Sequence, residues 1–163
     1  MANLQKDTPG LAEQYDDVSD LQFEHGKLLL QGLAFKNGDH LLDVGAGTGR
    51  LVALAASDYV GANGQVIGID PLPLRINIAQ ERARHLALAN LRFELGRAEH
   101  LVGFDDARFD AVVLNSVYHW LPHKDQVLGE AWRVLKIGGR IGISSAALEQ
   151  PHDIQRLAAR DRQ

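Results

Sequence analysis

The sequence predicts an α/β fold with a mostly parallel sheet in three layers. Short apolar runs recur along the chain, and each is followed by a turn and then by a stretch with helical periodicity. The run His40–Val44 leads directly into glycines at alternate positions, which is typical of a strand, a tight turn and the first turn of a helix. Strands that alternate with helices in this way form parallel sheets with right-handed crossovers.

The composition limits the classes of protein to which this chain can belong. The chain has 163 residues, of which 45% are hydrophobic and 23% are charged, and this suits one globular domain with a sizeable core. A net charge of −4 argues against a nucleic-acid binder. A local basic patch is an alternative interpretation. Its candidate residues are scattered, so a solvated helix face is the favoured interpretation for Arg75, Arg82, Arg84 and Lys124.

Cysteine usage and hydropathy exclude further classes. The absence of cysteine excludes a disulfide framework, a thiolate zinc site and a cysteine nucleophile. No apolar run reaches about 18 residues, and the start of the chain lacks the core of a signal peptide. We therefore expect no membrane association and a cytoplasmic protein.

Three glycines follow the central strand, at Gly45, Gly47 and Gly49. Glycine accepts a positive φ and lets another molecule approach the backbone closely. The helix that begins after them leaves unpaired N–H groups facing the crevice where open α/β sheets bind ligands. Such a turn suits NAD, another nucleotide or S-adenosylmethionine, and it also occurs as a plain tight connection.

The spacing of the glycines narrows this choice. The dinucleotide fingerprint Gly-x-Gly-x-x-Gly/Ala, counted from Gly45, would need a small residue where this chain has Arg50. The third glycine comes one residue early, and an acid, Asp43, stands two residues before the first. An NAD-binding oxidoreductase is therefore disfavoured.

The segment 43–49, Asp-Val-Gly-Ala-Gly-Thr-Gly, resembles the first motif of class I S-adenosylmethionine-dependent methyltransferases of the small-molecule, ubiquinone-biosynthesis-like type. The resemblance extends over roughly residues 31–145. It implies a Rossmann-like sandwich with strand order 3-2-1-4-5, N-terminal helices over the cofactor site, and S-adenosylmethionine as cofactor.

An acid closes the second predicted strand, Gln65–Asp70. It lies about 20 residues after the glycine turn, the distance expected of a carboxylate that accepts hydrogen bonds from ribose hydroxyls. The alternative is that Asp70 caps the helix after Pro71. Leu72 is expected against the adenine face.

The resemblance implies further cofactor contacts. Relatives often carry Gly-Asp-Ala-Glu after the third strand, whereas this chain has Arg97, which cannot accept a hydrogen bond, in place of the aspartate. The contacts implied there are the Ala98 N–H and Glu99. The full predicted cofactor set is Asp43, Gly45, Ala46, Gly47, Thr48, Gly49, Asp70, Pro71, Leu72, Ala98, Glu99, Asn115 and Ser116.

The segment after the fourth strand would face the methyl acceptor. His119 is the candidate general base, needed if the acceptor must lose a proton, and the alternative is a partly exposed histidine without a catalytic role. The predicted substrate pocket comprises Tyr15, His25, Tyr118 and Trp120. Trp132 is expected in the core. The histidines show no metal spacing, so no metal is predicted.

Two parts of the chain are predicted: residues 1–36 as a tail and helical lid, and residues 37–163 as the cofactor-binding domain. The helical pattern over 11–33 divides at Gly26, and packing of this helix on the sheet is the alternative to a lid. Relatives continue with two more strands, so we expect a truncated domain with 141–145 as an edge strand. A terminal helix or a second copy in a homodimer could cover that edge.

The first hypothesis is therefore a methyltransferase for a small-molecule oxygen, nitrogen or carbon acceptor. Some members of this broad group act on arsenite through cysteine thiolates, which this chain cannot supply. A non-catalytic relative that binds the cofactor and acts through association is the second hypothesis, and the NAD-binding oxidoreductase is the third.

Overall fold

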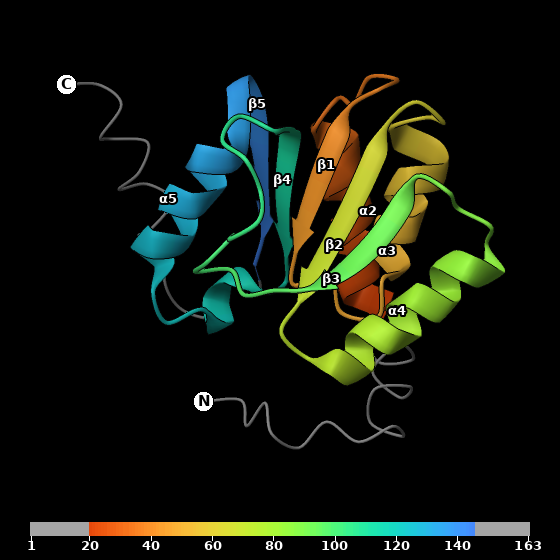
Figure 1. Ribbon diagram of the computed structural model, residues 1–163, viewed down its shortest axis with the longest axis horizontal. Helices are drawn as coiled ribbons and strands as arrows, with labels where there is room; N and C mark the ends of the chain where they lie inside the picture. The colour runs from red at the N-terminus through yellow and green to blue at the C-terminus, as the bar shows by residue number, and fades with distance from the viewer. Residues whose placement is uncertain (1–19, 146–163) are drawn as a thin grey trace.

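The computed structural model describes residues 20–145. Five strands form one sheet in the order β3-β2-β1-β4-β5, and all neighbouring pairs are parallel (Figure 1). The strands are β1 His40–Val44, β2 Gln65–Asp70, β3 Leu91–Leu95, β4 Phe109–Asn115 and β5 Leu135–Ser144. The predicted fold class and strand order are therefore confirmed.

Helices cover the two faces of this sheet unequally. They are α2 Asp20–Gly32, α3 Arg50–Leu54 with its π-helical continuation η2 Ala55–Tyr59, α4 Pro73–His85, the short 3-10 turn η3 Tyr118–Trp120, and α5 Lys124–Val134. None of the helices within residues 20–145 is both long and apolar enough to cross a membrane.

Alternation along the central strands explains the two faces. Successive side chains of a strand point to opposite sides, so Leu41 packs with α2, α3 and α4, whereas Leu42 packs with α5. Val112 and Val113 of β4 divide in the same way. Because both faces are buried, these strands consist of nearly continuous apolar residues.

Helix α2 runs without interruption through Gly26, so the predicted break at this glycine is wrong. A Cβ atom at Gly26 would lie 2.7 Å from the Leu51 side chain. The glycine therefore serves the close approach of α2 to the first turn of α3.

The connection between β3 and β4, residues 96–108, contains turns and no helix, so strands and helices do not alternate here. Arg133 of α5 fixes this connection. Its guanidinium donates to the carbonyl oxygens of Leu101 at 3.1 Å and Phe104 at 2.9 Å, and it pairs with Asp106 at 2.7 Å. A charged side chain of α5 thus holds this connection in place.

Two further predictions about the last elements need correction. β5 begins at Leu135, earlier than predicted, with an irregular register against the start of β4, and it forms an edge of the sheet among the described residues. Trp132 is 78% exposed and not in the core. Its neighbours Ala131 and Val134 face the sheet, and this directs the indole away from it.

Candidate cofactor and acceptor site

The turn after β1 is held against β2 by its own backbone. Gly45, Gly47 and Gly49 have φ values of 83°, 57° and 83°, in the left-handed region that favours glycine. The N–H groups of Gly45 and Ala46 both donate to the Ile69 carbonyl, at 2.8 and 2.9 Å. The turn is therefore a fixed surface at the carboxyl edge of the sheet.

The surroundings of the three glycines differ. A Cβ atom at Gly49 would lie 2.5 Å from the Phe93 ring, and one at Gly45 would lie 2.7 Å from Val117. At Gly47 no atom lies within 4 Å of that position. Gly49 therefore serves the packing of helix against sheet, one residue earlier than the dinucleotide fingerprint places it. Gly47 offers open backbone to a ligand.

Asp70 is 4% exposed and connects the glycine turn to the loop after β2. Its Oδ2 accepts from the Gly47 N–H at 3.1 Å, and its Oδ1 accepts from the Leu72 N–H at 3.0 Å. A carboxylate has about four acceptor sites, so Asp70 can accept several hydrogen bonds at once. Pro71 beside it is exposed and Leu72 is half-buried.

Asp43, at the end of β1, is 3% exposed, and its Oδ1 has no hydrogen-bond partner among residues 20–145. Burial, and then the negative charge of Asp70, raise the pKa of Asp43 to about 7. Thr48 is also buried, and its carbonyl accepts from the Arg82 Nε at 3.1 Å.

Asn115 ends β4 on the same face of the sheet as Asp43, because Asp43 pairs with Val113 and side chains alternate along a strand. Its Nδ2 donates to the Gln22 carbonyl of α2 at 3.1 Å. Its Oδ1 is buried and, in the described part of the chain, has no partner. Buried acceptors are nearly always paired, so two such oxygens on neighbouring strands indicate a site for a ligand's donor group.

The remaining predicted cofactor residues lie around the same edge. The Gly96 N–H donates to the Asp70 carbonyl at 3.2 Å, which brings the segment carrying Ala98 and Glu99 next to Asp70. Ala98 is buried and Glu99 is half-buried. Ser116 has a φ of 57°, and its N–H donates to the Ser144 carbonyl at 2.7 Å.

The predicted acceptor residues have unequal environments. Tyr118 is 5% exposed within the core cluster beneath α5, whereas Trp120 is 61% exposed. The His119 Nδ1 lies 3.2 Å from the Ser145 Oγ, and its ring centroid lies 4.8 Å from that of Trp120. Burial, and then the charge of Lys124, lower the pKa of His119.

His25 is exposed on α2, and Tyr15 lies outside the described residues. Sequence reasoning missed Gln22, Val117 and Ser145, each of which contacts a predicted site residue. No local pattern marks these three. Among residues 20–145, no three His, Asp or Glu side chains lie together as a metal site would require.

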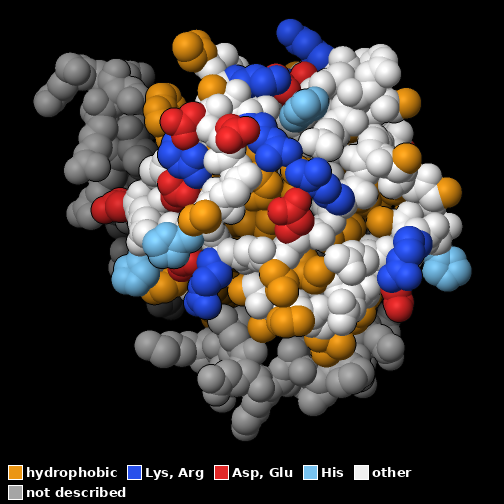
Figure 2. All heavy atoms as spheres, viewed as in Figure 1, with side chains coloured by type: hydrophobic (Ala, Val, Ile, Leu, Met, Phe, Trp, Pro, Cys, Tyr) orange, Lys and Arg blue, Asp and Glu red, His pale blue; other side chains and the backbone are white. Residues whose placement is uncertain are grey.

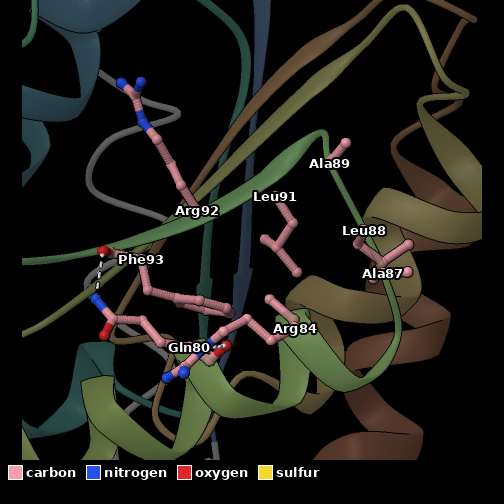
Figure 3. Close-up of a pocket in the computed structure, with 9 residues that line it drawn as sticks. Gln80, Arg84, Ala87, Leu88, Ala89, Leu91, Arg92 and Phe93 are labelled. Carbon is pink, nitrogen blue, oxygen red and sulfur yellow. Dashed lines mark hydrogen bonds between the residues drawn. The ribbon is translucent and has the colours of Figure 1, made fainter.

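A separate hollow of about 530 Å³ lies between α4 and β3, toward the start of that strand (Figure 3). The Gln80 amide donates to the Phe93 carbonyl at 3.4 Å across it. Arg84 and several alanines and leucines also line it. It lies away from the carboxyl edge of the sheet, so it is distinct from the glycine-turn crevice.

Comparison with known proteins identifies the family to which the chain belongs. A family described as a methyltransferase domain matches residues 35–161. An arsenite methyltransferase of Mus musculus is 34% identical in an alignment of 155 positions that covers 89% of this chain and 40% of that protein. A demethylmenaquinone methyltransferase of Lactobacillus johnsonii is 34% identical in an alignment of 139 positions that covers 82% of this chain and 56% of that protein.

A solved structure supports the same family assignment. The S-adenosylmethionine-dependent methyltransferase of Aquifex aeolicus superposes with a TM-score of 0.77 at 26% identity, over 91% of this chain and 78% of that one. The chain spans less than two thirds of the length of the two curated relatives named above. On the match to residues 35–161 and on this fold, the chain belongs to the methyltransferase-domain family, with the architecture of class I S-adenosylmethionine-dependent enzymes.

Proposed function

We propose that this chain transfers a methyl group from S-adenosylmethionine to a carbon, oxygen or nitrogen atom of a small molecule. The observation that carries the proposal is the pair of buried, unpartnered oxygens, Asp43 Oδ1 and Asn115 Oδ1, beside the open backbone of Gly47. Both are acceptors, and they suit a ligand that brings an ammonium group with several N–H donors. The residues present therefore fit S-adenosylmethionine.

Each part of the site has a separate task in this proposal. Asp43 and Asn115 hold the amino-acid end, Gly47 lets that end lie against the backbone, and Asp70 accepts from the ribose. Ala98 and Glu99 contact the adenine edge. When bound, the cofactor supplies an activated methyl group for in-line displacement. The protein then contributes chiefly orientation, which supplies on the order of 7–11 kcal/mol in well-aligned reactions.

His119 is the proposed general base for acceptors that must lose a proton. The Ser145 Oγ lies beside Nδ1, and a hydrogen bond there leaves Nε2 available to take the proton. The lowered pKa keeps the ring neutral, and thus basic, near pH 7. Trp120 offers an exposed aromatic surface to the acceptor, whereas Tyr118 supports η3 from the core.

The acceptor is proposed to be a small molecule because the curated relatives named above act on arsenite and demethylmenaquinone, as their names state. This chain has no cysteine and offers no thiolate to arsenite, so we favour a carbon, oxygen or nitrogen acceptor. Figure 2 shows basic and acidic side chains interspersed on the visible face, and no continuous basic surface for nucleic acid is seen there. A homodimer through the outer edge of β5 is also proposed, and a cytoplasmic location stays a prediction.

Two measurements test this function. Calorimetry with S-adenosylhomocysteine and with NAD should show micromolar binding of the first and none of the second. Incubation with methyl-labelled S-adenosylmethionine and fractionated small metabolites should then yield a labelled product. Binding of NAD in place of the adenosyl ligand would contradict the cofactor assignment. Cofactor binding without turnover on any fraction would favour the non-catalytic alternative.

A further inference from the structure

Helix α2 is attached at its first turns to residues that follow the glycine turn. Both terminal nitrogens of Arg50, the first residue of α3, lie 3.0 Å from Asp20 Oδ1. The same guanidinium lies 4.4 Å from the centroid of the Phe23 ring, so it pairs with an acid and with an aromatic face on one helix. Arg50 stands where the dinucleotide fingerprint would need a small residue.

A second contact joins α2 to the site itself. The Gln22 carbonyl accepts from Asn115 Nδ2, and a Cβ at Gly26 would lie 2.9 Å from that same nitrogen. The first half of α2 therefore rests on the end of β4 and on the start of α3. With Nδ2 bound to the helix, the Asn115 amide has its acceptor oxygen left for the buried site.

The other end of α2 is attached independently. Arg140 of β5 donates to the carbonyls of Leu33 and Ala34, each at 2.6 Å, and pairs with Asp39 at 2.5 Å. The chain after α2 is thus fastened to the sheet by Arg140, whereas the start of α2 depends on Arg50 and Asn115. Because these contacts are separate, we expect loss of the first set to leave the second in place.

We propose that Arg50 is a positioning residue that closes the first half of α2 over the cofactor crevice and so sets how long the cofactor stays bound. The proposal rests on the function proposed above. An ion pair to an acid as exposed as Asp20, at 77%, contributes little to fold stability. Its location instead makes it effective at the crevice, where it keeps Gln22 in place to orient the Asn115 amide.

The test is the dissociation rate of S-adenosylhomocysteine, measured by stopped-flow fluorescence or surface plasmon resonance. Arg50→Ala should accelerate dissociation about 5- to 10-fold, the combined effect of one exposed ion pair and one cation–π contact. Arg50→Lys should restore part of the slow rate, because it keeps the charge. Asp20→Asn and Phe23→Leu should each give a smaller acceleration and should be non-additive with Arg50→Ala.

Arg92→Ala is the control, because Arg92 also forms a solvent-accessible ion pair, with Glu94 at 2.9 Å, and lies on β3 beside the separate hollow, outside α2 and the crevice. It should leave the dissociation rate unchanged. Hydrogen exchange should rise in Arg50→Ala over residues 20–26 and stay constant over 28–32. These readouts separate positioning from a general loss of stability, which would speed exchange over the whole helix.

A dissociation rate for Arg50→Ala within twofold of the wild type, or equal to that of Arg92→Ala, would overturn the proposal. If Arg50→Ala fails to fold, the rate for Asp20→Asn decides the question in the same way. Failure of the wild-type chain to bind S-adenosylhomocysteine at all would instead contradict the proposed function, so the two failures are distinguishable.

Discussion

The proposed site has a cofactor half, formed by the glycine turn after β1 together with Asp70 and Asn115, and an acceptor half, formed by residues 118–120 after β4, and the two are built differently. After β1, the glycine turn is bonded to Ile69 and Asp70, and its polar side chains are buried. After β4, the chain passes through the strained Ser116 to His119 and the largely exposed Trp120. The cofactor half is held by many mutually dependent contacts, whereas the acceptor half presents side chains to solvent.

This difference bears on how the fold supports more than one reaction. A donor common to many enzymes needs one fixed binding surface, and we propose that here it consists of the glycine-turn backbone with the buried side chains of Asp43 and Asp70. Acceptors vary, and in the proposal above their contacts come from the short segment 118–120, in which Tyr118 packs in the core whereas Trp120 is exposed. Substitutions in the glycine turn and at residues 118–120 should therefore divide into effects on cofactor binding and effects on turnover.

The largest difference between an effect on turnover and an effect on cofactor binding is expected at His119. His119→Gln should lower kcat about 10²- to 10⁴-fold with an acceptor that loses a proton, the usual contribution of a general base. The affinity for S-adenosylhomocysteine should stay within twofold of the wild type. The pH profile of kcat/KM should show its acidic half-point below the ordinary histidine pKa of 6.5, because burial lowers the pKa of His119. Unchanged turnover would mean that a group other than His119 removes the proton.

Gly49→Ala tests the rigidity of the cofactor half. The added methyl would lie 2.5 Å from Phe93 at a φ of 83°, so we expect a loss of about 2–4 kcal/mol in the free energy of unfolding, from backbone strain and overpacking together. Gly47→Ala is the control, because it meets no atom within 4 Å and should cost about 1–2 kcal/mol from backbone strain alone. Urea denaturation measures both. Equal losses of unfolding free energy in the two variants would mean that the contact with Phe93 adds nothing to the cost of Gly49→Ala.

Asp43→Asn should make the protein more stable at alkaline pH and weaken cofactor binding. Burial, and then Asp70, raise the pKa of Asp43 from 3.8 to about 7, so the folded state binds this proton more tightly than the unfolded state does. The contribution of Asp43 to stability is thus full below pH 4 and is lost as pH rises to about 7. Above pH 7 the variant should gain on the order of 2–4 kcal/mol, with no gain near pH 4.

Unfolding curves of Asp43→Asn and wild type between pH 4 and 8 provide the measurement. Parallel curves across that range would show that Asp43 is ionised at no cost. Calorimetry with S-adenosylhomocysteine should, in the wild type, show affinity rising with pH through about 7 as the carboxylate forms. The variant should lack that dependence.

Asp70→Ala should weaken S-adenosylhomocysteine binding by about 1.5–3 kcal/mol, the range for hydrogen bonds to a charged group. Part of this loss comes from the glycine turn, since Gly47 and Leu72 both donate to the carboxylate. Asp70→Asn keeps one acceptor oxygen and should lose less. A dissociation constant that does not change in either variant would remove Asp70 from the ribose contacts.

The sheet could be predicted from the sequence because strand, turn and helix patterns are local. The runs at 40–44, 65–70 and 91–95 are strands with the predicted bounds, and β4 and β5 are longer than predicted. Trp132 could not be placed, since several faces of α5 carry apolar residues and contact with the sheet decides which is buried. The turns over 96–108 also depend on a distant side chain, Arg133.

Parts of the candidate site could be predicted from the sequence where their residues lie at a recognisable spacing. The glycine turn and Asp70 follow from spacing, and the structure brings them into hydrogen-bond contact. The contact between Gln22 and Asn115 joins residues 93 positions apart, through a backbone carbonyl that has no sequence signature. The role of Gly26 could not be predicted either, because its partner Leu51 lies on another helix.

The close fit of Val117 against Gly45 has a practical consequence for redesign. A side chain larger than valine at 117 would press on the first glycine of the turn, where a Cβ already has no room. Loop grafts meant to change acceptor choice should therefore keep this valine and place their upstream junction after it. Exchanged segments that include Val117 would change donor affinity and acceptor preference together. Selection for one of these properties would then also change the other.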